Sequence, residues 1–151
     1  MRTVQNILDL KGNPDNIIAP DTMVIDALRK LISVNLSYLL VYENNKFCGI
    51  FSERDYTRKL VLEGRSSRDT HVRDVMTVNL PQVSPDNTVE DCMYQMNVRG
   101  TRYVAAFDGE LFLGIITIHD LLREVLANKH YVFDDTLTST LLDTDESGKI
   151  F

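Results

Sequence analysis

The sequence predicts an α/β (α+β) protein made of two copies of one β-α-β-β-α unit. The motif Gly-Ile-x-[Ser/Thr]-x-x-Asp occupies residues 49–55 and returns 65 positions later, at residues 114–120. Residues 18–62 align with residues 83–127 without a gap, and ten of the forty-five positions are identical. Each copy also shows the same order of apolar patterns. Together these observations indicate a duplicated unit.

The elements of the first copy follow from local patterns. Residues 17–19 predict a short strand, and the next apolar positions have helical spacing, with Leu31 and Ile32 expected to face inward. The apolar run 36–42 predicts a strand buried on both faces. Residues 43–46 predict a hairpin turn and residues 47–51 the returning strand. Ser52 begins a second helix, in which Leu60 and Val61 are expected to face inward.

The second copy repeats this order, and short segments precede each copy. We expect strands at 82–84, 103–107 and 111–116, helices at 88–98 and 119–127, and a turn at Asp108-Gly109. Residues 4–8 and 72–77 each predict one short helical segment, and residues 64–70 form a polar linker. The expected division is therefore a first repeat with its leading segment and linker (1–72), a second repeat (73–130) and an acidic tail (131–151).

Composition and charge exclude several classes of protein. The net charge of −6 disfavours a nucleic-acid partner, and no apolar run approaches the length of a membrane helix. The N-terminus lacks the pattern of a signal peptide. Cys48 and Cys92 lack metal-ligand spacing and are expected to be buried, which suits a reduced, cytoplasmic protein. Residues 54–73 carry a net charge of +3, which suits a small anion, although a solvated charged face remains the alternative.

With this motif present twice, the chain resembles the CBS domain family, and the tandem copies resemble a CBS pair, or Bateman module. Pro20-Asp21 and Pro85-Asp86 precede the first helix of each copy, and residues 72–77 (VRDVMT) match the usual linker V-x-D-I-M-T. The stretch 49–77 is similar to small stand-alone CBS-pair proteins. The resemblance covers about residues 1–130. It implies two units packed sheet to sheet with pseudo-twofold symmetry, two clefts for AMP, ADP, ATP, NAD(H) or S-adenosylmethionine, and a disc-shaped homodimer.

The residue types in the motif suit a nucleotide. Asp55 and Asp120 each follow a hydroxyl residue by three positions at a strand-to-helix turn. A carboxylate can accept both ribose hydroxyls, and a hydroxyl beside free helix amides offers donors to a phosphate. The same spacing also describes a capping box that stabilises the helix, and the two roles are compatible.

Positions in the resemblance give the expected nucleotide-binding residues. The first cleft is expected to use Ile18, Tyr38, Ser52, Arg54, Asp55, Met76 and Thr77. The second is expected to use Val83, Thr101, Arg102, Tyr103, Thr117, His119 and Asp120, closed by Val4 and Lys11 from the leading segment. Two departures stand out. Met23 replaces the usual threonine before the first helix, and His119 replaces a small residue, either adding a phosphate contact or crowding the cleft.

Neither catalytic residues nor metal ligands are expected. His119-Asp120 lacks the further ligands of a metal hydrolase, and no nucleophile elbow surrounds Ser52. Residues 143–148 match the first six positions of a calcium loop, but the acid at position twelve would fall at residue 154. An acidic, solvated tail is the preferred interpretation.

The predicted function is a non-catalytic regulatory module, of the energy-sensing kind. It requires no cofactor, binds AMP, ADP, ATP or NAD(H) as a ligand and signals to an unidentified regulated protein by conformational change of a homodimer. No nucleic acid and no membrane is expected as a partner. The alternative is a ligand-free dimerisation scaffold. A nucleotide-hydrolysing enzyme is the remote alternative.

Overall fold

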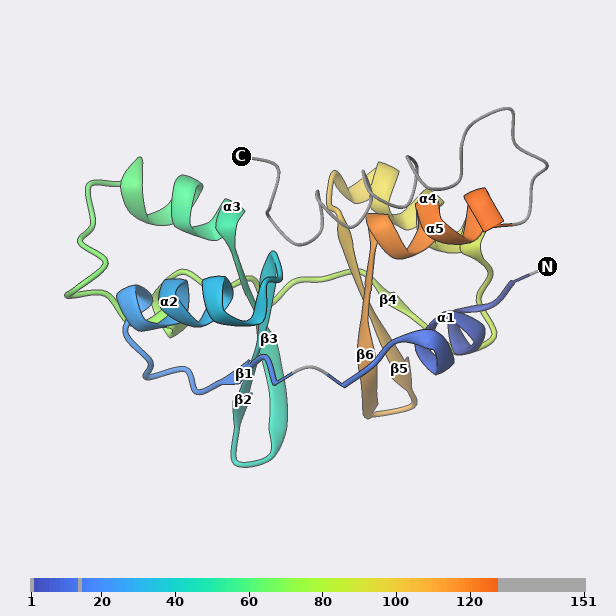
Figure 1. Cartoon of the computed structure of the whole chain (residues 1–151), viewed down its shortest axis with the longest axis horizontal. Coiled ribbons are helices and arrows are strands. Elements are labelled where there is room, and N and C mark those ends of the chain that lie inside the picture. The colour runs from blue at the N-terminus through green and yellow to red at the C-terminus, as the bar shows by residue number, and fades with distance from the viewer. Residues whose placement is uncertain (1, 14, 128–151) are drawn as a thin grey trace. The chain divides into compact units, whose positions relative to one another are not determined.

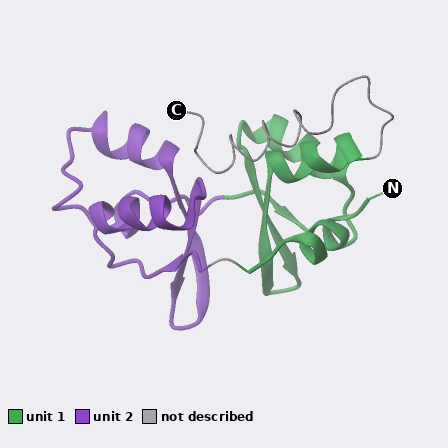
Figure 2. Ribbon diagram, viewed as in Figure 1, with its two compact units in different colours: residues 1–13, 80–143 green, residues 14–79, 144–151 purple. Residues whose placement is uncertain are grey.

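The computed structural model describes residues 2–13 and 15–127, which form two compact units (Figure 2). Unit 1 combines the leading segment, up to Asn13, with the chain from Leu80 onward. Unit 2 contains the intervening chain up to Asn79. The leading segment therefore packs with the second repeat, and the linker after residue 64 packs with the first. This differs from a division at residue 72, because each repeat completes its core with the segment that lies beside it in space.

Unit 2 is built on a three-stranded sheet in the order β1-β2-β3 (Figure 1). The strands are β1 (Ile17–Ile18), β2 (Tyr38–Glu43) and β3 (Lys46–Ser52); β1 is parallel to β2, and β2 is antiparallel to β3. Its helices are α2 (Val24–Val34), α3 (Glu53–Asp55), the π-helical continuation η1 (Tyr56–Val61) and the 3-10 turn η2 (Val72–Asp74). The predicted β-α-β-β-α order is confirmed.

The hairpin between β2 and β3 turns on two asparagines. Asn44 and Asn45 have φ values of 52° and 61°, the left-handed conformation that a two-residue hairpin turn requires. Asparagine tolerates this conformation better than most residues. The turn and a register shift between Val41 and Tyr42 together set the register in which Tyr38 lies opposite Ser52. The buried Tyr38 therefore lies beside Ser52, the N-cap residue of α3.

The core of unit 2 lies between the sheet and its helices. Leu39, Val41 and Phe51 of the sheet pack with residues of α2 and with Val72 and Val75 of the linker. Two residues expected to face inward do not. Ile32 is 80% exposed and Val61 is 49% exposed, so those two predictions are wrong. Each directly follows a buried leucine (Leu31 or Leu60), and the rotation of about 80–100° from one helical residue to the next carries it off the buried face.

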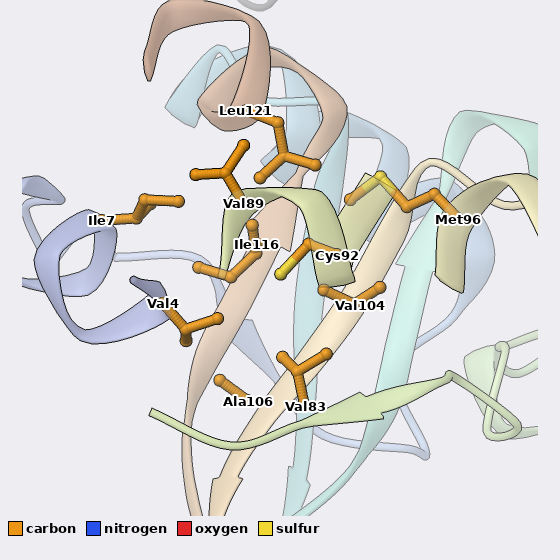
Figure 3. Close-up of a cluster of buried hydrophobic side chains, with 10 residues drawn as sticks. All are labelled: Val4, Ile7, Val83, Val89, Cys92, Met96, Val104, Ala106, Ile116 and Leu121. Atoms are coloured by element: carbon orange, nitrogen blue, oxygen red, sulfur yellow. The ribbon is translucent and has the colours of Figure 1, made fainter. Parts of the chain in front are cut away.

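Unit 1 repeats the same topology with a sheet in the order β4-β5-β6. The strands are β4 (Gln82–Val83), β5 (Tyr103–Asp108) and β6 (Leu111–Thr117), and the helices are α1 (Val4–Leu10), α4 (Val89–Arg99) and α5 (Ile118–Ala127). In its core, Val4 and Ile7 of α1 share a cluster with Ile116 of the sheet and Leu121 of α5 (Figure 3). The leading segment is thus a structural part of this unit.

Helix α4 of unit 1 begins at a capping box. Thr88 caps this helix: its hydroxyl accepts the amide of Asp91, and the Asp91 carboxylate accepts the amide of Thr88 at 2.9 Å. The bond from the Thr88 amide, together with the Asn87 side chain, lowers the pKa of Asp91. Cys92 directly follows Asp91, and burial raises the pKa of its thiol to about 11. Cys92 is buried as expected, whereas Cys48 is only partly covered.

The segments that precede each repeat occupy equivalent places. Thr3 forms a bridge with Thr88 in unit 1, and His71 forms a bridge with Met23 in unit 2. Since Met23 and Thr88 are equivalent in the two repeats, the leading segment corresponds to the linker with an offset of 68 residues. Val4 then corresponds to Val72, and both are fully buried.

The motif glycines make room for these segments. Thr77 exchanges two backbone hydrogen bonds with Ile50, at 2.8 and 3.0 Å. A Cβ atom on Gly49 would lie only 2.4 Å from the carbonyl oxygen of Thr77. A Cβ atom on Gly114 would lie 2.9 Å from Cδ2 of Leu8 in the leading segment. A larger residue at either glycine would therefore push the packed segment away.

The helices within residues 2–13 and 15–127 are all too short or too polar to span a bilayer. The sheet-to-sheet packing with pseudo-twofold symmetry that the resemblance implies stays a prediction.

Candidate functional site

The first motif surrounds Asp55, which is 3% exposed at the junction of β3 and α3. Its Oδ2 atom accepts hydrogen bonds from the Ser52 amide at 2.9 Å and from the Ser52 hydroxyl at 3.1 Å. The Asp55 amide in turn donates to the Ser52 hydroxyl at 3.3 Å. This is the predicted capping box, and it holds the carboxylate in a fixed orientation.

The other oxygen of Asp55 faces the linker and the next turn of helix. Its Oδ1 atom accepts a hydrogen bond from the Thr77 hydroxyl at 2.7 Å and pairs with Nζ of Lys59 at 2.9 Å. The Lys59 ammonium also donates to the Thr77 hydroxyl at 3.1 Å and to the carbonyl oxygen of Met76 at 3.3 Å. Ser52, Asp55 and Thr77, all predicted site residues, therefore lie together.

The second motif surrounds Asp120, which is 6% exposed at the start of α5. Its Oδ2 atom accepts the Thr117 amide at 2.8 Å and the Lys11 ammonium at 2.7 Å. The Asp120 amide donates to the Thr117 hydroxyl at 3.2 Å, so the capping geometry repeats. Lys11 also donates to the carbonyl oxygen of Ile115 at 2.9 Å. The predicted residues Lys11, Thr117 and Asp120 therefore lie together.

The two motifs differ in the source of the lysine. Lys59 comes from the helix that follows Asp55, but the equivalent position in the second repeat is Glu124. Glu124 is buried and pairs with Nε of Arg2 at 3.2 Å. Lys11 of the leading segment instead supplies the cation beside Asp120. Both carboxylates are compensated, as a buried charge requires, but by different parts of the chain.

The predicted tyrosines lie next to the motifs in the sheets. Tyr38 is opposite Ser52 in the β2–β3 pair, and Tyr103 is opposite Thr117 in the β5–β6 pair. Both tyrosines are buried. Thr101 accepts the Tyr103 amide at 3.3 Å, which fixes the start of β5. The tyrosines therefore border the motif hydroxyls, as their positions predicted.

The remaining predicted residues fall into two groups. Val4 and Val83 are core residues of unit 1, and Ile18 and Met76 pack against the core of unit 2. Their side chains contribute packing in this structure. The charged or polar members lie closer to solvent: Arg102 is exposed, and Arg54 and His119 are half-buried in the first turns of α3 and α5. The backbone carbonyl of Arg102 accepts a hydrogen bond from the Ile118 amide at 3.0 Å, and this bond positions the start of α5.

Lys59 is the functional candidate that sequence reasoning missed. It lies four residues after Asp55 on the same helix, a spacing at which opposite charges meet. That spacing was a usable signal. It was obscured because the second repeat has a glutamate at this position, so Lys59 does not belong to the repeated pattern.

The two clusters share the residue types of a binding site. Each contains a buried carboxylate, the kind of group that accepts hydroxyl protons, and an adjacent ammonium, the kind of group that pairs with an anion. Within the described part of the chain, no group of three or more His, Cys, Asp or Glu side chains could hold a metal ion. The calcium-loop-like residues 143–148 lie outside the described residues.

Comparison with known proteins gives a consistent assignment. The sequence model of the CBS domain matches residues 13–62 and 72–127. The chain is 33% identical over 133 residues to the mitochondrial CBS domain-containing protein CBSX3 of Arabidopsis thaliana, covering 82% of this chain and 65% of that protein. It is 31% identical over 121 residues to arabinose 5-phosphate isomerase KdsD of Francisella tularensis, covering 80% of this chain and 36% of the isomerase. The chain thus spans only part of the length of both relatives.

Solved structures show the same fold. A protein with CBS domains from Burkholderia ambifaria is 31% identical with a TM-score of 0.79, covering 88% of this chain and 100% of that one. CBSX2, solved in complex with AMP, has a TM-score of 0.66 at 23% identity, covering 86% and 100% of the two chains. A CBS domain pair solved with 5′-methylthioadenosine and S-adenosyl-L-methionine has a TM-score of 0.71 at 21% identity, covering 85% and 99%. At the last two identities the likeness concerns the fold alone.

Proposed function

Because this chain belongs to the CBS domain family and carries two copies of the domain, we propose that it is a regulatory module that binds an adenosine-containing nucleotide. The observation that carries the proposal is the repeated cluster of a hydroxyl, a buried carboxylate and a lysine. Asp55 lies with Lys59, and Asp120 lies with Lys11, each at a strand-to-helix junction. No bond of the ligand is broken in this function.

The residue types of these clusters suit the ribose phosphate part of a nucleotide wherever the carboxylate has an acceptor position available. A carboxylate accepts ribose hydroxyl protons in charge-assisted bonds, which are about twice as strong as neutral ones. A lysine beside it neutralises the phosphate. The tyrosine that borders each motif in the sheet, Tyr38 or Tyr103, offers an apolar ring for the base.

Neighbouring folds support the ligand class. AMP is bound by CBSX2, and 5′-methylthioadenosine with S-adenosyl-L-methionine by another CBS domain pair. These ligands share an adenosine group and differ in charge. For this chain we propose AMP, ADP, ATP or NAD(H), because the lysines favour a phosphate over an uncharged or cationic substituent.

We propose that the module acts as a homodimer that signals by conformational change. Large apolar side chains are exposed on both units. In unit 2 these are Ile32 on α2 and Leu62 directly after η1, and in unit 1 they are Tyr94 and Val98 on α4. Exposed apolar side chains of this size favour burial against a second copy. A nucleotide that binds one conformation better shifts the population toward it, and a regulated protein would recognise that conformation.

The test is thermal unfolding against AMP, ADP, ATP, NAD⁺, NADH and S-adenosylmethionine. A ligand at one hundred times its dissociation constant adds about 2.7 kcal/mol to the free energy of unfolding. For a chain of this size that raises the unfolding midpoint by roughly 5–10 °C. A flat response to the whole panel, on protein freed of co-purified nucleotide, would contradict nucleotide binding and support the dimerisation scaffold.

The scaffold alternative is favoured by one observation, the complete set of internal partners around Asp55. Size-exclusion chromatography with light scattering separates the two functions. A scaffold gives a stable dimer whose size and thermal stability do not change when nucleotides are added. A sensor responds to the nucleotide, and the response disappears when the ligand-binding carboxylate is replaced. Hydrolysis of nucleotides by this chain would contradict both functions.

A further inference from the structure

We propose that the two carboxylates are not equivalent: Asp120 of unit 1 takes the nucleotide, whereas Asp55 of unit 2 is closed by its own chain. This inference rests on the proposed function and adds which repeat binds and how many nucleotides each chain takes. The two carboxylates are buried to a similar degree. They differ in the hydrogen bonds and ion pairs that they accept, and not in their exposure to solvent.

Asp55 has no acceptor position left. An ionised carboxylate offers about four hydrogen-bonding positions on its two oxygens. In Asp55 these positions are used by the Ser52 amide, the Ser52 hydroxyl, the Thr77 hydroxyl and the Lys59 ammonium, at distances of 2.7–3.1 Å. A ribose hydroxyl could bind only by displacing Thr77 or Lys59. Thr77 is in addition held by two backbone bonds to Ile50.

Asp120 keeps one oxygen available. Its Oδ2 atom accepts the Thr117 amide and the Lys11 ammonium, but its Oδ1 atom is approached only by Nη1 of Arg123, at 4.0 Å, among the described residues. That distance is an ion pair and too long for a hydrogen bond. A ribose hydroxyl can therefore donate to Oδ1 without breaking any bond that the carboxylate already has.

The difference has a simple cause in the sequence. At the offset of 68 residues that relates Thr3 to His71, the sequence has Asp9 in place of Thr77, and α1 continues to Leu10 whereas η2 ends at Asp74. A carboxylate has no proton to donate at neutral pH and cannot cap a second carboxylate. Asp9 instead lies on the exposed side of α1, where it accepts the side-chain amide of Gln5 at 2.7 Å. The hydroxyl that closes Asp55 has no counterpart at Asp120.

The charges around Asp120 indicate a phosphorylated ligand. Nζ of Lys11 lies 2.7 Å and Nη1 of Arg123 lies 4.0 Å from the carboxylate, so two cations border the oxygen that would receive the ribose. An adenosine ligand that carries a phosphate near the ribose would pair with these cations, whereas uncharged adenosine would not. Lys11 is thus a specificity-determining residue, supplied by the leading segment.

Isothermal titration calorimetry with AMP tests the proposal on the full chain. We expect one AMP per wild-type chain. Asp120→Asn removes the charge that receives the ribose and should weaken binding at least 100-fold. The matched variant Asp55→Asn should keep the affinity within about threefold. Lys11→Met should weaken AMP at least tenfold while changing the affinity for adenosine less than threefold.

Folding of each variant is checked by circular dichroism. Should Asp55→Asn fail to fold, Thr77→Val perturbs the same carboxylate more mildly, and AMP affinity should again stay within threefold. The wild-type stoichiometry is in any case independent of the variants. Two equal AMP sites per chain, or binding lost in Asp55→Asn and kept in Asp120→Asn, would overturn this inference and leave nucleotide binding intact. No binding of AMP, ADP, ATP or NAD(H) would overturn the proposed function, and this inference with it.

Discussion

Nζ of Lys11 lies 2.7 Å from Oδ2 of Asp120, although the two residues are 109 positions apart in the chain. Nζ of Lys59 lies 2.9 Å from Oδ1 of Asp55, only four positions away. The two repeats thus reach the same local charge balance by a distant contact in one unit and a local contact in the other. The leading segment is consequently needed both for the core of unit 1 and for the charge balance of its motif.

Lys11→Met should destabilise unit 1. The methionine keeps most of the apolar stem, but Asp120 loses its nearest cation while staying buried. A buried charged acceptor that loses its partner costs about 1–3 kcal/mol. Urea unfolding of the unliganded protein measures the loss. The control is Lys30→Met, whose partner Asp15 is 88% exposed and whose pair should contribute less than about 1 kcal/mol. Equal losses in the two variants would contradict the role of Lys11.

Gly49→Ala and Gly114→Ala should both destabilise the protein, for different reasons. At Gly49 the new methyl group would meet a backbone carbonyl of Thr77 at 2.4 Å, and overpacking against backbone costs about 1–3 kcal/mol. At Gly114 the methyl group would meet the end of the flexible Leu8 side chain at 2.9 Å, which can change rotamer, but the φ of 157° is a conformation that side chains rarely adopt. The free energy of unfolding of each variant measures both losses.

Gly12→Ala provides the control for the glycine series. A Cβ atom there would meet nothing within 4 Å, so its stability should differ from that of the wild type by less than about 0.5 kcal/mol. A Gly49→Ala variant as stable as Gly12→Ala would show that the linker does not hold its close approach to β3.

Met23→Thr should stabilise unit 2. Met23 occupies the N-cap of α2 without a side-chain hydrogen bond, whereas Thr88 caps the equivalent helix α4 together with Asp91. Asp26 already stands at the place of Asp91, so a threonine at position 23 would complete the capping box. We expect a gain of about 0.5–1 kcal/mol, and the reciprocal Thr88→Ala should lose about 1 kcal/mol. Thermal unfolding of both variants checks the opposite signs.

Cys92 should make the stability of unit 1 depend on alkaline pH. Burial holds the pKa of its thiol at about 11, whereas an unfolded cysteine ionises near pH 8.5. Between these values the unfolded state has released a proton that the folded state retains. The free energy of unfolding therefore falls as pH rises from about 8.5 to 11. Other groups titrate in this range as well, so the measurement is the difference in urea midpoint between the wild type and Cys92→Ala. This difference should shrink or reverse as pH rises from 8 to 10.5, and a pH-independent difference would contradict the prediction.

The parts of the fold that repeat could be predicted from the sequence. The gapless match of the two copies located every strand, and the turn residues Asn44, Asn45 and Gly109 marked both hairpins. Helix ends were predicted to within a residue or two where a capping residue was visible, as at Thr88. These features depend on local interactions, which a single sequence records directly.

The features that could not be predicted depend on contacts between residues far apart in the sequence or on differences between the two repeats. Periodicity marked Ile32 and Val61 as apolar but could not tell the edge of a helix face from its centre. The pair of Arg2 with Glu124 joins residues with no common pattern in the sequence. The place of Lys11 at the second motif was expected only through the resemblance, and its ion pair with Asp120 was not predicted. The closing of Asp55 by Thr77 and Lys59 required the actual geometry.

The placement of α1 in unit 1 also has a consequence for synthesis on the ribosome. Val4 and Ile7 belong to a core whose other members begin at Val83 and extend to Leu121, so α1 must wait for about a hundred residues to be translated. At 5–20 residues per second, this delay is about 5–20 seconds. Unit 2, whose described residues end at Asn79, can fold in the meantime. Until the ribosome has passed Leu121, the apolar side of α1 is exposed to chaperones, and proteolysis of arrested nascent chains should cut near it.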